Sequence, residues 1–134
     1  MGENRVTLAK TRRVLIVDDA ALVRAYYRQA LEQAGYHVDE ALNGLEALEK
    51  VLLHSFDLLI VDVNMPQMDG ITFLRALRNK ELPMSAVPTL VTSTEAGPQD
   101  ISSARAAGAN YYVIKPLKQE ALTELADMLC GIVA

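Results

Sequence analysis

The sequence predicts an α/β fold in which helices cover both faces of one doubly wound, parallel β-sheet. Two observations support this prediction. Short apolar segments alternate along the chain with longer segments in which apolar residues recur at helical spacing, and this alternation is typical of parallel strands joined by right-handed crossover helices. The apolar run LLIV at positions 58–61 has no polar face, as expected of a central strand that is buried on both sides.

Segments rich in Val, Ile, Leu and Tyr are predicted to form the strands, because these residues fit a half-buried or fully buried pleated surface. There are five such segments, at residues 13–17, 37–41, 58–62, 89–91 and 111–114. Prolines 83 and 88 are expected to bracket a loop before the fourth strand. The strand signals therefore predict a five-stranded sheet.

Apolar residues at helical spacing between and after these strands predict five helices. They are marked by Val23, Tyr27, Ala30, Leu31 and Ala34, by Ala47, Leu48, Val51 and Leu52, by Ile71, Leu74 and Leu77, by Ile101, Ala104 and Ala107, and by Ala121, Leu122, Leu125 and Leu129. Gly35 is placed to end the first helix, and Pro98 suits the first turn of the fourth. The fourth helix has mostly small residues, so little apolar area anchors it.

Length and composition limit the class of protein. The chain has 134 residues, 51% hydrophobic and 22% charged, which suits one globular domain at residues 13–134 behind a flexible lead-in at residues 1–12. The net charge of −4 argues against DNA binding through phosphate contacts. No apolar run is long enough for membrane insertion, the polar N-terminus is not a secretory signal, and the single Cys130 fits a reducing, cytoplasmic location.

Polar side chains follow four of the five predicted strands. Asp18 and Asp19 come after the first strand, Asp62 ends the third, Thr92 follows the fourth and Lys115 follows the fifth. All strands of a parallel sheet end at the same edge, and ligands of open α/β sheets bind there. We therefore expect these side chains to converge on one site.

Three carboxylates at one edge repel one another, by about 4 kcal/mol for two unit charges ~4 Å apart at an effective dielectric near 20. The repulsion should raise the pKa of at least one of them. Lys115 supplies one compensating charge, and a hard divalent cation such as Mg²⁺ or Mn²⁺ would supply two more. A carboxylate beside a lysine, a hydroxyl and Mg²⁺ has the parts of a phosphoryl-transfer site, with Asp62 as the nucleophile.

These residues stand in motifs that together resemble the receiver domain of two-component response regulators, especially its stand-alone, CheY-like members. The motifs are LIVDD at 15–19, DVNMPQMDG at 62–70, LVTS at 90–93 and GANYYVIKP at 108–116. The resemblance implies the flavodoxin-like strand order 2-1-3-4-5. It also implies a signalling module that catalyses only its own phosphorylation and dephosphorylation.

The resemblance further implies a role for each residue of the site. Asp62 would accept a phosphoryl group from a sensor histidine kinase or phosphotransfer protein, in a Mg²⁺-dependent reaction. Asp18, Asp19, Asp62 and the backbone carbonyl of Asn64 would hold the metal. Lys115, with a cis bond to Pro116, and Thr92 would contact the phosphoryl group, and Tyr112 would be the aromatic switch coupled to Thr92.

Two further positions and one surface follow from the same resemblance. Asn64 and Thr94 would tune hydrolysis, and Thr94 stands where CheY has an acidic residue. The surface made by the fourth helix, the fifth strand and the fifth helix would bind the downstream protein, since the chain ends shortly after that helix. Motor regulator, phosphate sink and relay intermediate remain open.

Three other protein classes share some of these features. A flavodoxin-like electron carrier would need a phosphate-binding first loop, which Asp18 and Asp19 would repel. A hydrolase with an aspartate nucleophile usually has a second Asp two residues later, where this chain has Asn64. A pseudo-receiver that only binds partners would not need the full set of acidic residues and Lys115.

Overall fold

The computed structural model of the protein describes residues 11–132. Its five strands form one parallel sheet in the spatial order β2-β1-β3-β4-β5, which confirms the expected order. The strands are β1 (Arg13–Val17), β2 (His37–Ala41), β3 (Leu58–Asp62), β4 (Thr89–Ser93) and β5 (Tyr111–Ile114). Strand β4 includes Thr92 and Ser93, which are buried and paired with β5. The lead-in predicted for residues 1–12 lies outside the described residues except for residues 11 and 12.

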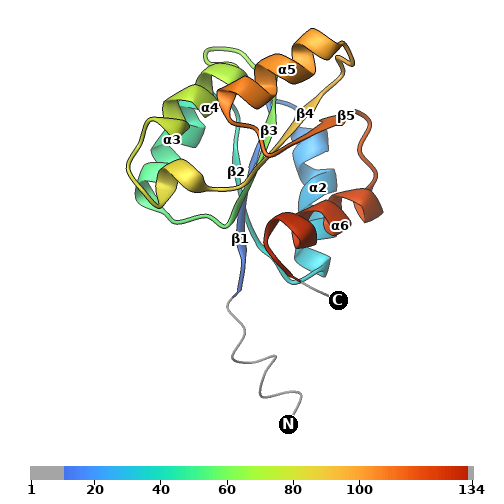
Figure 1. Cartoon of the computed structure of the whole chain (residues 1–134). Coiled ribbons are helices and arrows are strands. Elements are labelled where there is room, and N and C mark those ends of the chain that lie inside the picture. Colours follow the sequence, from blue (N-terminus) through green and yellow to red (C-terminus); the bar gives the residue numbers. More distant parts are fainter. Residues whose placement is uncertain (1–10, 133–134) are drawn as a thin grey trace.

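Five α-helices connect and cover the strands, as predicted. They are α2 (Ala21–Gln33), α3 (Gly44–Leu53), α4 (Gly70–Arg78), α5 (Pro98–Ala107) and α6 (Gln119–Leu129). Helices α2 and α6 lie on one face of the sheet, and α3, α4 and α5 lie on the other (Figure 1). Within residues 11–132, no helix is long and apolar enough to cross a membrane.

Alternate residues of each central strand enter two different cores. Val14 and Ile16 of β1 pack toward α2 and α6, whereas Leu15 and Val17 pack toward α3, α4 and α5. All four are fully buried, which is why the sequence of a central strand shows no polar face. The two cores fix the sheet from both sides and hold its carboxyl edge in place.

Side chains at helix termini set where the connecting loops end. The side chain of Asn43 accepts a hydrogen bond from Glu46 N at the start of α3, and Asp69 accepts one from Thr72 N at the start of α4. Both are N-caps, which satisfy backbone donors that have no partner within the helix. Helix α5 ends at Gly108, whose φ of 114° lies in the left-handed region that glycine tolerates.

The connection from α4 to β4 contains a short 3₁₀ helix, η1 (Met84–Ala86), that the sequence did not predict. Arg78 organises this connection. Its guanidinium donates hydrogen bonds to the carbonyls of Val87 at 2.7 Å and Gly108 at 2.7 Å, and to Asn110 Oδ1 at 3.0 Å. One side chain thus joins the end of α4, the start of β4 and the end of α5.

Candidate functional site

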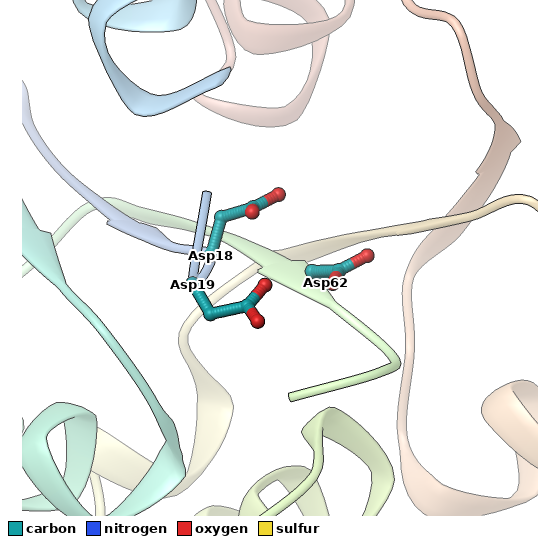
Figure 2. Close-up of side chains that lie close together, drawn as sticks. All are labelled: Asp18, Asp19 and Asp62. Carbon is teal, nitrogen blue, oxygen red and sulfur yellow. The ribbon is translucent and has the colours of Figure 1, made fainter. Parts of the chain in front are cut away.

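Three carboxylates meet at the carboxyl edge of the sheet, as predicted (Figure 2). Asp18 and Asp19 follow β1, and Asp62 is the last residue of β3. One ligand atom from each lies within 4.8 Å of the others. Asp18 and Asp62 are buried, whereas Asp19 is exposed, so the cluster is accessible from solvent on the Asp19 side.

Backbone hydrogen bonds fix the carboxylate of Asp18. Asp18 N donates to Ala41 O at the end of β2 at 3.1 Å, and Asp18 Oδ1 accepts from Ala20 N at 2.9 Å. Arg24 of α2 donates to the Asp18 carbonyl at 2.8 Å and also pairs with Glu40 of β2 at 2.7 Å. The turn after β1 is therefore held by β2 and α2 together, and the Asp18 carboxylate has a fixed position.

Lys115 bridges two of the carboxylates from the far end of the sheet. Its Nζ lies 3.0 Å from Asp18 Oδ2 and 3.1 Å from Asp62 Oδ1. The Lys115–Pro116 peptide bond is cis, as the resemblance implied. Burial lowers the pKa of Lys115, but its bonds to Asp18 and Asp62 outweigh burial and leave that pKa above its ordinary value. Lys115 is therefore a permanent cation at the site.

Asp62 has a raised pKa, as expected for one of the crowded carboxylates. The cause differs from the predicted one. Burial is the largest contribution, the hydrogen bond and charge of Lys115 oppose it, and repulsion by Asp18 and Asp19 adds a smaller increase. The sequence showed the neighbouring charges but not how completely the end of β3 is enclosed, so it suggested repulsion instead.

Thr92 is paired directly with Asp62 in the β3–β4 ladder. Thr92 is fully buried. Within residues 11–132, its Oγ1 is the only buried side-chain polar atom without a hydrogen-bond partner. Buried hydroxyls are nearly always hydrogen-bonded, since an unpaired one costs about 1–3 kcal/mol. This hydroxyl is therefore available to a group bound at Asp62.

The β3–α4 loop passes close to the backbone of Asp62. A Cβ atom built at Gly70 would collide with Asp62 O, and Gly70 N donates to Val63 O at 2.9 Å. Only glycine permits this approach. Asn64 lies in this loop and is exposed. Sequence reasoning assigned Gly70 only to the start of a helix and missed its contact with the nucleophile strand, although the spacing DVNMPQMDG was noted.

Tyr112 and Thr92 lie on opposite faces of the sheet. Thr92 pairs with Val113, which packs toward α2 and α6, whereas Tyr112 pairs with Val91 and packs toward α3, α4 and α5. The Tyr112 hydroxyl donates to the carbonyl of Glu95 at 2.7 Å. The two residues are thus linked through the β4–α5 loop, which begins at Thr94.

Residues 14–127 match the response regulator receiver domain family. The chain belongs to this family. The receiver domain is 36% identical over 122 residues to the gliding motility regulatory protein of Myxococcus xanthus, and 37% identical over 128 residues to the sensor protein EvgS of Escherichia coli (strain K12). These alignments cover 90% and 95% of the chain but only 16% and 10% of the relatives, so the chain spans less than a fifth of their length.

Solved structures agree with this family assignment. The receiver domain is similar to the chemotaxis response regulator CheY4 of Vibrio cholerae, with a TM-score of 0.83, 35% identity, and coverage of 90% of this chain and 99% of that one. A CheY-like receiver domain protein from Methanospirillum hungatei JF-1 gives a TM-score of 0.84 at 27% identity, covering 91% and 95%. Receiver domains are signalling modules.

The acidic cluster of this receiver domain fits a hard divalent cation. Asp18, Asp19 and Asp62 together offer carboxylate oxygens within 4.8 Å of one another, which is the donor type that Mg²⁺ prefers. Lys115 balances only part of their negative charge, because it contacts Asp18 and Asp62 but has no ion pair with Asp19 among residues 11–132. These residues could therefore hold a Mg²⁺ ion on the exposed, Asp19 side.

Proposed function

We propose that Asp62 of this receiver domain accepts a phosphoryl group and that the modified site switches a partner-binding surface. The observation that supports the proposal most directly is the unpartnered Thr92 hydroxyl directly across from Asp62. A phosphoryl group on Asp62 adds strong acceptor oxygens. Thr92 would donate to one of them, and Lys115 would pair with another.

The phosphoryl transfer is a displacement at phosphorus. A carboxylate oxygen of Asp62 attacks the phosphorus of a phosphohistidine, the new O–P bond forms, and the P–N bond breaks. The imidazole nitrogen keeps the electron pair of that bond and takes up a proton. In hydrolysis, water attacks the same phosphorus, the O–P bond to Asp62 breaks, and the carboxylate and inorganic phosphate are released.

Asp18, Asp19, Asp62 and the backbone carbonyl of Asn64 would hold Mg²⁺ or, alternatively, Mn²⁺. The bound ion would neutralise charge that develops on the phosphoryl oxygens. Lys115, which contacts both Asp18 and Asp62, would supply further positive charge. Asn64 and Thr94 would tune hydrolysis, since both are exposed and near the end of β3 or β4, where attacking water arrives.

The signal would leave the site through the β4–α5 loop. The Thr92 hydroxyl would turn toward the phosphoryl group and draw the backbone after β4 with it. The Tyr112 hydroxyl is bonded to Glu95 O in that loop and would respond to the movement. Helix α5 buries only Ala104 and Ala107, so a small free energy suffices to shift it. The surface made by α5, β5 and α6 would bind the downstream protein, and Tyr111 and Ile114 of β5 are exposed there.

The immediate partner would be a sensor histidine kinase or a phosphotransfer protein, and the downstream target another protein rather than DNA or membrane. We propose a cytoplasmic, stand-alone regulator of the chemotaxis or phosphorelay type. The flavodoxin-like alternative has less support, because the first βα loop presents Asp18 and Asp19 where a flavin phosphate would need donors.

The proposal is tested by labelling the purified protein with radioactive acetyl phosphate. Wild type should incorporate label with millimolar Mg²⁺ and lose nearly all incorporation with EDTA. Asp19→Asn should need more Mg²⁺ for the same rate, and Asp100→Asn, an exposed aspartate in α5, should match wild type. Labelling that is equally fast in EDTA would contradict a metal-dependent receiver site.

A further inference from the structure

A cavity of about 520 Å³ adjoins the proposed phosphoryl site on its α2 side. Its walls include Tyr26 and Tyr27 of α2, Thr94 after β4, and Lys115 with Pro116 after β5. The cavity opens to solvent and most of its lining is apolar, so a polar atom that reaches it has few partners within the protein. The residue of interest is Tyr27, which sequence reasoning counted only as an apolar position of the helix.

Tyr27 is 2% exposed, and its ring belongs to the core between α2, α6 and the sheet. Helical side chains lean toward the helix N-terminus. The N-terminus of α2 is at Ala21, directly after the acidic turn, so the phenol is directed toward the carboxyl edge of the sheet. The hydroxyl of Tyr27 makes no hydrogen bond within residues 11–132, and its oxygen is not sealed from solvent as Thr92 Oγ1 is, so water in the cavity can reach it.

One N–H group of the Lys115 ammonium is not used by the two carboxylates. Of its three N–H groups, one faces Asp18 and one faces Asp62, and within residues 11–132 the third has no partner. Burial raises the pKa of Tyr27, the charge of Lys115 opposes that rise, and the charges of Asp18 and Asp62 add to it. The phenol is therefore neutral at physiological pH, lies within electrostatic reach of Lys115, and can accept a hydrogen bond.

We propose that the Tyr27 hydroxyl is a positioning group for Lys115, joined to its ammonium across this cavity by a bridging water or by a small rotation of the lysine. The inference rests on the proposed function. Phosphorylation of Asp62 requires Lys115 to turn from a carboxylate oxygen to a phosphoryl oxygen. The Tyr27 oxygen keeps one N–H group of Lys115 hydrogen-bonded during that turn. It thereby fixes the direction of the other two N–H groups.

The test compares Tyr27→Phe with wild type, and uses Tyr26→Phe as the matched control. Each variant loses one hydroxyl and keeps its ring, and Tyr26 is half-exposed on the neighbouring position of α2. The probe is beryllofluoride with Mg²⁺, which imitates the charge and shape of a phosphoryl group on a carboxylate. Affinity for Mg²⁺ alone and the melting temperature are measured in parallel.

Tyr27→Phe should bind beryllofluoride about three- to tenfold more weakly, the effect of losing one hydrogen bond of ordinary strength. Its maximal labelling rate with acetyl phosphate should fall by a similar factor, while the donor concentration for half-maximal rate, the Mg²⁺ affinity and the melting temperature stay as in wild type. Tyr26→Phe should match wild type throughout.

Wild-type affinity and labelling in Tyr27→Phe would overturn the inference. So would a loss in Tyr27→Phe that is accompanied by equal losses of Mg²⁺ affinity and stability, since that pattern indicates a packing role. If wild type itself neither binds beryllofluoride nor accepts label, the proposed function fails instead, so the two failures are distinguishable.

Discussion

Lys115 Nζ lies 3.1 Å from Asp62 Oδ1, so the carboxylate that ends the central strand is held against a cation from the last strand of the sheet. The contact does not fully offset burial, because the pKa of Asp62 stays above its ordinary value. Asp62 is therefore a reactive carboxylate that is kept ionised at some cost to stability. That conflict between folding and function leads to the first prediction.

Asp62→Asn should stabilise the metal-free protein at pH 7. An acid whose pKa is raised by folding stabilises the fold below its unfolded pKa, and this contribution is lost as pH rises through the folded pKa. A neutral amide side chain avoids that loss. The free energy of unfolding should therefore rise by about 1 kcal/mol, and the melting temperature by about 3–5 °C in a domain of this length. Urea unfolding in EDTA should show the gain at pH 7 and its decrease on acidification. A less stable variant at pH 7 would show that Lys115 more than offsets burial.

Thr92→Val should stabilise the unphosphorylated protein by about 1 kcal/mol, because it replaces an unpartnered buried hydroxyl with a methyl group of the same size. The variant should still accept a phosphoryl group, since Asp62 and the acidic cluster are unchanged. Hydrogen exchange along residues 97–112 should then no longer respond to phosphorylation. An undiminished response would mean that the signal leaves the site without Thr92.

Gly70→Ala should impair both stability and labelling, because the added Cβ collides with the backbone carbonyl of Asp62. Forcing these segments apart should cost about 1–3 kcal/mol and displace the nucleophile. Gly97→Ala is the matched control, because a Cβ there meets only the movable carboxylate of Asp100. Denaturant unfolding and acetyl phosphate labelling measure the two effects. Equal behaviour of the two variants would refute the proposed close-packing role.

Arg78→Met should lower the free energy of unfolding by about 2–4 kcal/mol. The substitution keeps most of the stem but leaves the Gly108 carbonyl without its donor and the Val87 carbonyl with only the Thr89 hydroxyl. A buried acceptor that is left unsatisfied costs about 1–3 kcal/mol. Arg75→Met on the exposed side of α4 should change stability by less than about 0.5 kcal/mol. Urea titrations give the free energy of unfolding of both variants. Similar free energies for the two would show that solvent replaces the hydrogen bonds of Arg78.

The sequence was sufficient for the sheet, its helices and the convergence of Asp18, Asp62 and Lys115, because strand ends of a parallel sheet share one edge whatever the loops do. It was insufficient for contacts that depend on loop paths. The partners of Arg78 lie up to 32 residues away, and no local pattern specifies them. Likewise, helical spacing placed Tyr27 in the core but could not show where its hydroxyl points.

The most direct test of the central claim is intact-mass measurement after treatment with acetyl phosphate and Mg²⁺. We expect one added phosphoryl group on wild type, located on Asp62 by peptide mapping, and none on Asp62→Asn. Asp57→Asn, an aspartate at the opposite end of β3, serves as the positive control and should be labelled like wild type. Labelling of Asp62→Asn at the wild-type rate would contradict the assignment of Asp62 as the phosphoacceptor.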